Sequence, residues 1–301
     1  MLNIAIHPVV GSDVTSVTCW CILKPMQMKR SKTGLYFVLA LILAIALGWF
    51  VFAQQAAAPT KTSTKATTQK TSTTVQKKIE VTLPGASPIE ARVEDYHEPT
   101  SLWVVVSKTY PLSNDAYRPT DLVLPGIPQR KDKSQDERSV RQVIAPDLVA
   151  MVNDAKAQGY DLMVGSGFRS KELQSVYYNS ILKASGQAVA DKQSALPGKS
   201  EHQTGLALDI AYTDMGNCYI EVCFGSTPAG KWIAANSYKY GFIVRYPEDK
   251  TEITQYQYEP WHIRYVGKPL AQALHDSGLT LDEARPYLEK ARDALLAAHK
   301  I

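Results

Sequence analysis

The sequence predicts an α+β domain with a mainly antiparallel sheet, preceded by an apolar segment and a polar tether. The C-terminal two thirds of the chain intersperse strand-like and helix-like patterns without regular βαβ repeats, which argues against a parallel sheet. Residues 34–52 carry no charge and are rich in Leu, Ala, Ile and Phe, whereas residues 53–80 are rich in Thr and Lys and cannot form a packed core. The predicted organisation is a leader (1–33), the apolar segment (34–52), a disordered linker (53–80) and a folded domain (81–301).

The apolar segment is long enough to span a bilayer as a helix. Three basic residues within positions 29–32 precede it directly, so the N-terminus is expected in the cytoplasm and the folded domain outside the cell membrane. A cleaved signal peptide is the alternative, with Val51 and Ala53 at the small-residue positions before the cut, and it would make the protein secreted. The first 25 residues do not look like an export leader, so we expect a true start at Met26 or Met28.

The composition is that of an ordinary globular protein, with 45% hydrophobic and 21% charged residues in a chain of 301. The net charge of +4 is concentrated at the N-terminus. Residues 1–80 hold nine Lys and Arg against two acids, whereas the remainder holds 24 basic and 27 acidic side chains. The folded domain is therefore slightly acidic and lacks the basic stripe of a nucleic-acid-binding protein.

Capping residues and apolar faces predict five helical stretches in the folded domain. The signals are proline in a first turn, Ser or Thr as N-cap, and glycine after the last turn. The expected ranges are 146–158, 170–184, 228–239, 268–276 and a stretch from a capping box at 280, which a proline at 286 divides.

Strands are predicted from short runs rich in aromatic and β-branched residues. The expected ranges are 103–107, 162–164, 206–211, 242–246 and 261–266. The third run is unusual because Asp209 interrupts an otherwise apolar sequence. A buried carboxylate is costly unless it is paired or bound to a metal, so Asp209 is a candidate ligand.

Two histidines accompany this carboxylate. His202 lies in the loop before the strand of Asp209, and His262 lies in the last predicted strand. Either histidine alone would more often be structural, but two neutral imidazoles and a carboxylate suit a catalytic zinc site with a fourth position for water. Glu259, three residues before His262, is the natural general base. Pro260 disfavours the helix that a His-Glu-x-x-His motif would require.

The segments 202–209 and 259–267 together resemble the VanY-like D-alanyl-D-alanine carboxypeptidases, which are zinc peptidases of the bacterial cell wall. The resemblance extends over about residues 103–288. It implies a hedgehog/DD-peptidase-like fold with helices flanking the sheet. It also implies removal of the C-terminal D-alanine from peptidoglycan stem peptides, at either a D-Ala-D-Ala or an L,D bond.

Substrate contacts are expected for three further residues. Arg169, at a strand-to-helix junction, and Gln174, one turn into the helix, match a family segment that lines the substrate cleft. Arg169 is expected to stabilise the oxyanion or to hold the substrate carboxylate, because its guanidinium is a fork of donors. Ser200 is expected to hydrogen-bond the substrate terminus. The alternatives are a solvated surface position for Arg169 and Gln174 and loop capping for Ser200.

Two other functions remain open from the sequence. An endopeptidase of related fold would cut within the stem peptide and would need a cleft open at both ends. A non-catalytic wall-binding module stabilised by zinc is the second, and Glu259 argues against it because a structural site has no need of a base.

Four cysteines fall into two pairs. Cys19 and Cys21 lie in the leader, whereas Cys218 and Cys223 lie five apart in the folded domain. Outside the membrane, a disulfide between Cys218 and Cys223 is expected to close a small loop, with free or metal-bound thiols as the alternative.

Overall fold

The computed structural model describes residues 79–92, 99–212, 216 and 218–299, all within one structural unit that spans residues 74–301. The predicted leader, the apolar segment and nearly all of the linker therefore lie outside the described residues, as do Cys19 and Cys21. Among the helices that are described, none has both the length and the apolar character needed to cross a membrane.

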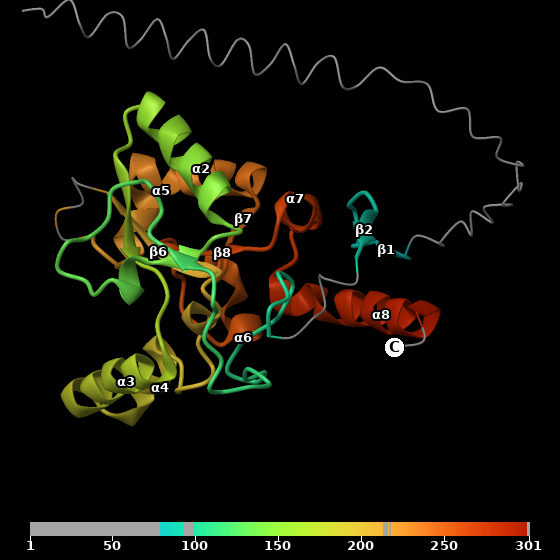
Figure 1. Cartoon of the computed structure of the whole chain (residues 1–301). Helices are drawn as coiled ribbons and strands as arrows, with labels where there is room; N and C mark the ends of the chain where they lie inside the picture. The colour runs from blue at the N-terminus through green and yellow to red at the C-terminus, as the bar shows by residue number, and fades with distance from the viewer. Residues whose placement is uncertain (1–78, 93–98, 213–215, 217, 300–301) are drawn as a thin grey trace, which may run out of the picture. The chain divides into compact units, whose positions relative to one another are not determined.

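A four-stranded antiparallel sheet with the strand order β5-β6-β8-β7 organises the domain (Figure 1). Its strands are β5 (Leu162–Ser166), β6 (Ala207–Tyr212), β7 (Phe242–Val244) and β8 (His262–Tyr265). Each coincides with one of the predicted strands. The antiparallel pairing and the interspersed helices confirm the predicted α+β class.

The five predicted helices begin close to the predicted residues because their capping signals are local. Ser170 Oγ accepts a hydrogen bond from the Leu173 backbone N–H, and Thr227 Oγ1 accepts one from Gly230, as expected of N-caps. The α-helices are α2 (Ala145–Ala157), α3 (Lys171–Ser185), α4 (Gln187–Gln193), α5 (Pro228–Asn236), α6 (Thr251–Thr254), α7 (Lys268–Ser277) and α8 (Leu281–His299). The 3-10 helices are η2 (Asp136–Arg138), η3 (Glu201–Thr204), η4 (Val222–Ser226), η5 (Ser237–Tyr240) and η6 (Glu248–Lys250).

The main hydrophobic core lies between the sheet and helices α2 and α5. Leu208 and Ile210 of β6 and Ile263 of β8 are fully buried in this core. Because successive side chains of a strand point to opposite faces, Asp209 and His262 lie on the other face of the sheet. The candidate ligands therefore occupy the face that does not pack against α2 and α5.

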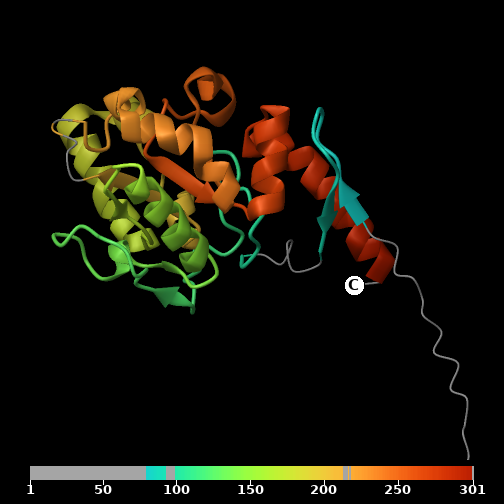
Figure 2. The same ribbon diagram turned by 90° about the horizontal axis from the view of Figure 1, so that it is seen from above.

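A second hydrophobic cluster joins the C-terminal helices to a short hairpin of β1 (Ile79–Val81) and β2 (Ile89–Ala91). Figures 1 and 2 both show this hairpin beside α8. The predicted domain start at residue 81 falls inside β1. The hairpin was not predicted, because strands of three residues carry too little pattern to detect. A further two-residue pair joins β3 (Leu122–Val123) to β4 (Val140–Arg141).

The strand predicted over residues 103–107 is wrong, although Trp103, Val104 and Val106 are buried. This segment has no partner strand among the described residues. Instead, Arg264 donates hydrogen bonds to the carbonyls of Leu102 and Val104, and Arg245 donates to Val106. Buried guanidinium groups thus satisfy backbone groups that a neighbouring strand would otherwise have paired.

The division of the last helix at Pro286 is also wrong, because α8 continues from Leu281 to His299 with this proline inside it. The predicted capping box is present at its start, where Thr280 and Glu283 exchange backbone-to-side-chain hydrogen bonds. Leu288, Ala291 and Leu295 bury the apolar face of the helix in the second cluster. This packing offsets the hydrogen bond lost at the proline.

Candidate active site

Three side chains from separate segments meet on the face of the sheet that does not pack against α2 and α5. His202 comes from η3, Asp209 from β6 and His262 from β8, and Asp209 and His262 are directly paired in the strand register. Each side chain offers one ligand atom, and these atoms lie within 4.8 Å of one another. Asp209 Oδ2 is 3.5 Å from His202 Nε2, and Asp209 Oδ1 is 3.4 Å from His262 Nδ1. The structure therefore brings together the three predicted ligands.

The orientation of His202 is set by the turn that follows β5. His202 Nδ1 lies 2.7 Å from the carbonyl oxygen of Gly167, which accepts its hydrogen bond, so Nε2 is left facing Asp209. The loop can reach this position because Gly205, with φ +67°, ends η3 in the left-handed conformation. The ring is therefore fixed with its unprotonated nitrogen toward the cluster.

His262 presents the opposite nitrogen to the same place. Its Nδ1 faces Asp209 and lies 3.7 Å from Glu259 Oε2. Its Nε2 points to the other side, 3.8 Å from Oε2 of Glu201. Glu201 itself is held by Arg245 and Arg264, each 2.8 Å from its Oε1.

Glu201, Arg245 and Arg264 were not among the predicted site residues. The signal that could have found the two arginines was available, because both stand in strand-like runs, as Asp209 does. Burial alone would raise the pKa of Glu201, but the two guanidinium groups hold that pKa well below its usual range. Glu201 is therefore a buried, ionised carboxylate behind the candidate ligands.

Glu259 has the environment of a group that exchanges protons near neutral pH. It is 7% exposed, and burial together with the charge of Asp209 raises its pKa to about 7, against the opposing effect of His262 and Arg169. Its backbone is fixed by hydrogen bonds to Tyr246 and His262. A carboxyl group with these properties can act as either base or acid.

The charges around the cluster favour a cation at its centre. Burial would lower the pKa of His262, but Asp209 and Glu201 instead raise it to about 9, so the acids hold this ring as a cation when nothing else supplies charge. Asp209 Oδ1, which faces Nδ1 of His262, is buried without a hydrogen-bond partner among the described residues. A carboxylate with an unused oxygen and two imidazoles beside it fit a divalent metal ion.

Arg169 and Gln174 lie together beside the cluster. Arg169 donates to Gln174 Oε1 at 3.0 Å and to Ser166 Oγ at 3.2 Å, and it lies 3.6 Å from Asp209 Oδ2. Gln174 is 2% exposed, and its Nε2 donates to the Ala195 carbonyl. Both the oxygen and the nitrogen of its side-chain amide are therefore hydrogen-bonded. Neither residue is a solvated surface group, and Gln174 is placed to hold Arg169.

The three predicted ligands and the four predicted catalytic or substrate-binding residues line one cleft of about 360 Å³. Ser200 is buried at its wall and makes no side-chain capping hydrogen bond at the start of η3, so its hydroxyl is not used as the loop cap that we considered. The cleft walls also include side chains that the sequence analysis did not assign, among them Lys133, Tyr177, Ile220, Glu221 and Gln257.

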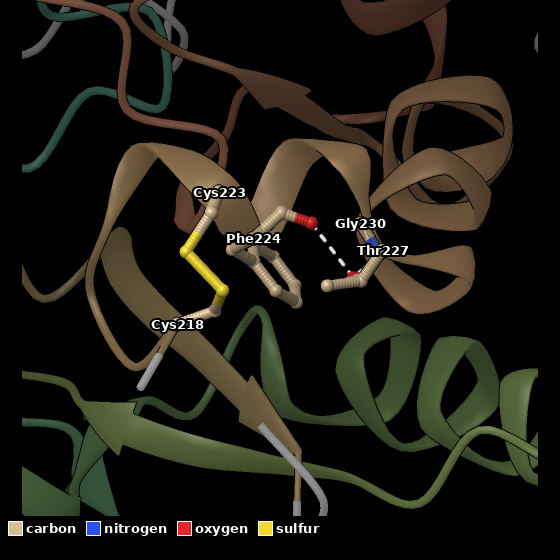
Figure 3. Close-up of a disulfide and its surroundings, with 5 residues drawn as sticks. All are labelled: Cys218, Cys223, Phe224, Thr227 and Gly230. Carbon is tan, nitrogen blue, oxygen red and sulfur yellow. Dashed lines mark hydrogen bonds between the residues drawn. A yellow bond between two sulfur atoms is a disulfide. The ribbon is translucent and has the colours of Figure 1, made fainter. Parts of the chain in front are cut away.

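A disulfide joins Cys218 and Cys223, as predicted (Figure 3). It closes the loop that carries Ile220 and Glu221 to the cleft wall. Within this loop, Ile220 has φ +51°, a backbone conformation that is rare for a β-branched residue.

A protein-family model described as VanY, D-alanyl-D-alanine carboxypeptidase, matches residues 137–268. The putative carboxypeptidase YodJ of Bacillus subtilis (strain 168) is 42% identical over 200 residues, which are 66% of this chain and 71% of that protein. A D-alanyl-D-alanine carboxypeptidase of Enterococcus faecium is 42% identical over 153 residues, which are 50% of this chain and 45% of the relative.

The fold is also similar to solved structures of carboxypeptidases. The LdcB LD-carboxypeptidase is 42% identical, with a TM-score of 0.59 over 64% of this chain and 88% of that one. The D,D-pentapeptidase VanY of a VanB-type resistance cassette, solved as a mutant in complex with Zn(II), is 32% identical. Its TM-score is 0.50 over 61% of this chain and 98% of that one.

Proposed function

The chain belongs to the VanY family of D-alanyl-D-alanine carboxypeptidases, and we propose that it uses one zinc ion to remove the C-terminal D-alanine from peptidoglycan stem peptides. The observation that carries this proposal is the cluster of His202, Asp209 and His262 with Glu259 beside it, open to a cleft. Three protein ligands with a free position and an adjacent base are what metal-assisted peptide hydrolysis requires.

The three candidate ligands would hold zinc through Nε2 of His202, a carboxylate oxygen of Asp209 and Nδ1 of His262. Zinc bound by such a set lowers the pKa of water to about 7 and polarises a carbonyl. That this metal is zinc is supported by the donor set and by the zinc in the related VanY structure.

Glu259 is proposed as the group that moves the proton. With a pKa of about 7, its carboxylate can take a proton from the attacking water and then return it to the leaving amine. Its carboxylate lies beside His262 Nδ1, on the side of the ring that faces Asp209, so it acts where the candidate ligand atoms converge.

Arg169 is proposed to bind the negative charge of the substrate. Arg169 lines the cleft, and its buried Nε has no hydrogen-bond partner among the described residues. A fixed cation can stabilise an oxyanion, and a guanidinium can also bind a terminal carboxylate. Gln174 and Ser166 keep the guanidinium in place for either role.

For the location of the protein, we propose that the domain works outside the cell membrane, where peptidoglycan is found. The support is the uncharged run of residues 34–52 and the basic residues that precede it. Fractionation with an antibody against the folded domain tests this. Finding the domain in the membrane fraction would agree with an anchor, and finding it in the medium would agree with a cleaved signal. Finding the domain only in the cytosol would contradict the proposal.

The activity is tested with muropeptide pentapeptide and tetrapeptide offered separately to the purified, zinc-loaded chain, with product mass as the readout. We expect loss of one alanine from at least one substrate, which also decides between D,D and L,D specificity. Chelation and the Glu259→Ala variant should each abolish the loss, whereas Glu248→Ala, at a residue outside the cleft, should not. Cleavage within the stem peptide would instead identify an endopeptidase.

A further inference from the structure

A buried cluster of three charged residues lies directly behind the proposed metal ligands. Glu201, Arg245 and Arg264, which we call the Arg–Glu–Arg cluster, are at most 1% exposed. Both arginines donate to the same carboxylate oxygen, Oε1 of Glu201, at 2.8 Å. The other oxygen, Oε2, is left on the side that faces His262.

Two buried polar atoms face each other at this point. Oε2 of Glu201 and Nε2 of His262 are 3.8 Å apart, and neither has a hydrogen-bond partner among the residues that the structure describes. A buried donor or acceptor without a partner is costly, and a shift of less than about 1 Å would join these two. A histidine that binds metal through one nitrogen commonly donates from the other to a carboxylate, which fixes its tautomer.

We propose that Glu201 is the positioning residue of His262, accepting Nε2–H so that the lone pair of Nδ1 faces Asp209 and the metal. This inference rests on the metal centre of the proposed function. The two arginines hold Oε1 of Glu201, so that Oε2 is the oxygen that His262 meets. His202 is oriented differently, by a backbone carbonyl.

The same contacts connect the metal centre to the C-terminal helix. Arg245 also forms a hydrogen-bonded ion pair with Asp282, in the first turn of α8, whose side chain is 11% exposed. Asp282 lies beyond the residues that match the family model. Without the carboxylate of Asp282, the fully buried guanidinium of Arg245 would lose one of its two ion pairs. Arg245 would then be held less firmly against Glu201. Asp282 therefore supports the position of His262 through Arg245 and Glu201.

Glu201→Gln is the direct test. The amide oxygen has to face the two arginines, so its NH₂ group would face His262 Nε2 and place donor against donor. We expect the zinc dissociation constant, measured by competition with a chromogenic chelator, to rise about 10- to 100-fold. In the wild-type zinc complex, ¹⁵N NMR should show His262 protonated at Nε2, and this signal should be lost or exchange faster in the variant.

Asp282→Asn gives a second test that leaves Glu201 in place, in case the first variant does not fold. Glu283→Gln is the matched control, because Glu283 lies on the same helical turn but pairs with Lys250 rather than with Arg245. We expect Asp282→Asn to weaken zinc binding about threefold to tenfold, and Glu283→Gln to stay within about twofold of the wild type.

The results separate this inference from the proposed function. Wild-type protein that binds no zinc would refute the metal centre, and with it this inference. Zinc binding with His262 protonated at Nδ1 would overturn the positioning role alone. A folded Glu201→Gln variant with a zinc affinity within twofold of wild type would also overturn the positioning role. Equal zinc affinities of Asp282→Asn and Glu283→Gln would show that Asp282 of α8 does not support the position of His262.

Discussion

Arg169 shows how tightly a single cleft residue is constrained. Its guanidinium contacts Gln174 and Ser166 and lies 4.8 Å from the centre of the Tyr177 ring. We predict that Arg169→Lys lowers kcat/KM by about 10²- to 10³-fold, because lysine keeps the charge but loses the planar fork that these contacts position. The measurement is steady-state kinetics of D-alanine release by zinc-loaded enzyme.

The matched control is Arg118→Lys, at a half-exposed arginine that pairs with Asp136 outside the cleft. It should leave kcat/KM within about twofold, since exposed ion pairs contribute little. Zinc affinity should be unchanged in both variants. If Arg169→Lys retained full activity with normal zinc content, charge alone would suffice and the directed donor proposed here would be wrong.

The sequence was sufficient to find the residues of the site that carry a local pattern. Asp209 was conspicuous because it interrupts an apolar strand, and the strand pairing then places it opposite His262. Glu201 was missed because its role depends on Arg245 and Arg264, more than forty residues away, which no local pattern connects to it. Recognition of Glu201 therefore requires the tertiary structure.

Among the secondary-structure elements, those with local signals were predicted and those that depend on distant partners were not. Helices α2, α3 and α7 have proline or capping residues at their starts, and their observed ends lie within a residue or two of the prediction. The β1–β2 hairpin and the segment over residues 103–107 instead owe their conformation to α8 and to buried arginines.

The backbone of the turn between β5 and α3 orients one of the proposed metal ligands. Gly167 donates to the Glu137 carbonyl and accepts from His202, and a Cβ at this position would clash with the Ser139 carbonyl. We predict that Gly167→Ala costs about 1–3 kcal/mol of unfolding free energy. Zinc affinity should fall as well, because a shifted turn moves the acceptor that orients His202. Urea unfolding and chelator competition measure the two effects.

Gly126→Ala is the control for that turn. A Cβ at Gly126 would meet nothing within 4 Å and its φ is not positive, so the substitution should change stability by less than about 0.5 kcal/mol. Equal stability and equal zinc affinity of the two alanine variants would show that the turn tolerates a side chain and does not fix the histidine.

At the scale of the whole molecule, acid sensitivity should follow from carboxylates that the fold holds ionised. Glu137 connects η2 to α3 and to the turn after β5, through its side chain to Tyr177 and its carbonyl to Gly167. Burial alone would raise its pKa, but hydrogen bonds from Tyr177, Ser134 and Lys133 lower it to about 2. Glu201 likewise has a lowered pKa, because the charges of Arg245 and Arg264 outweigh burial.

A carboxylate with a lowered pKa stabilises the folded state above its ordinary pKa, and this contribution is lost as the pH falls toward the folded value. For Glu137, the stabilisation should be complete above about pH 5 and should disappear near pH 2, amounting to at most about 3 kcal/mol. Glu137→Gln should therefore be less stable than wild type at pH 7, and urea unfolding should show the difference narrowing steadily below about pH 4.5. Glu289→Gln, which removes the partly exposed pair with Arg285, should change stability by less than about 1 kcal/mol. A Glu137→Gln deficit of the same size at pH 3 as at pH 7 would mean that the side chain stabilises the fold by packing rather than by charge.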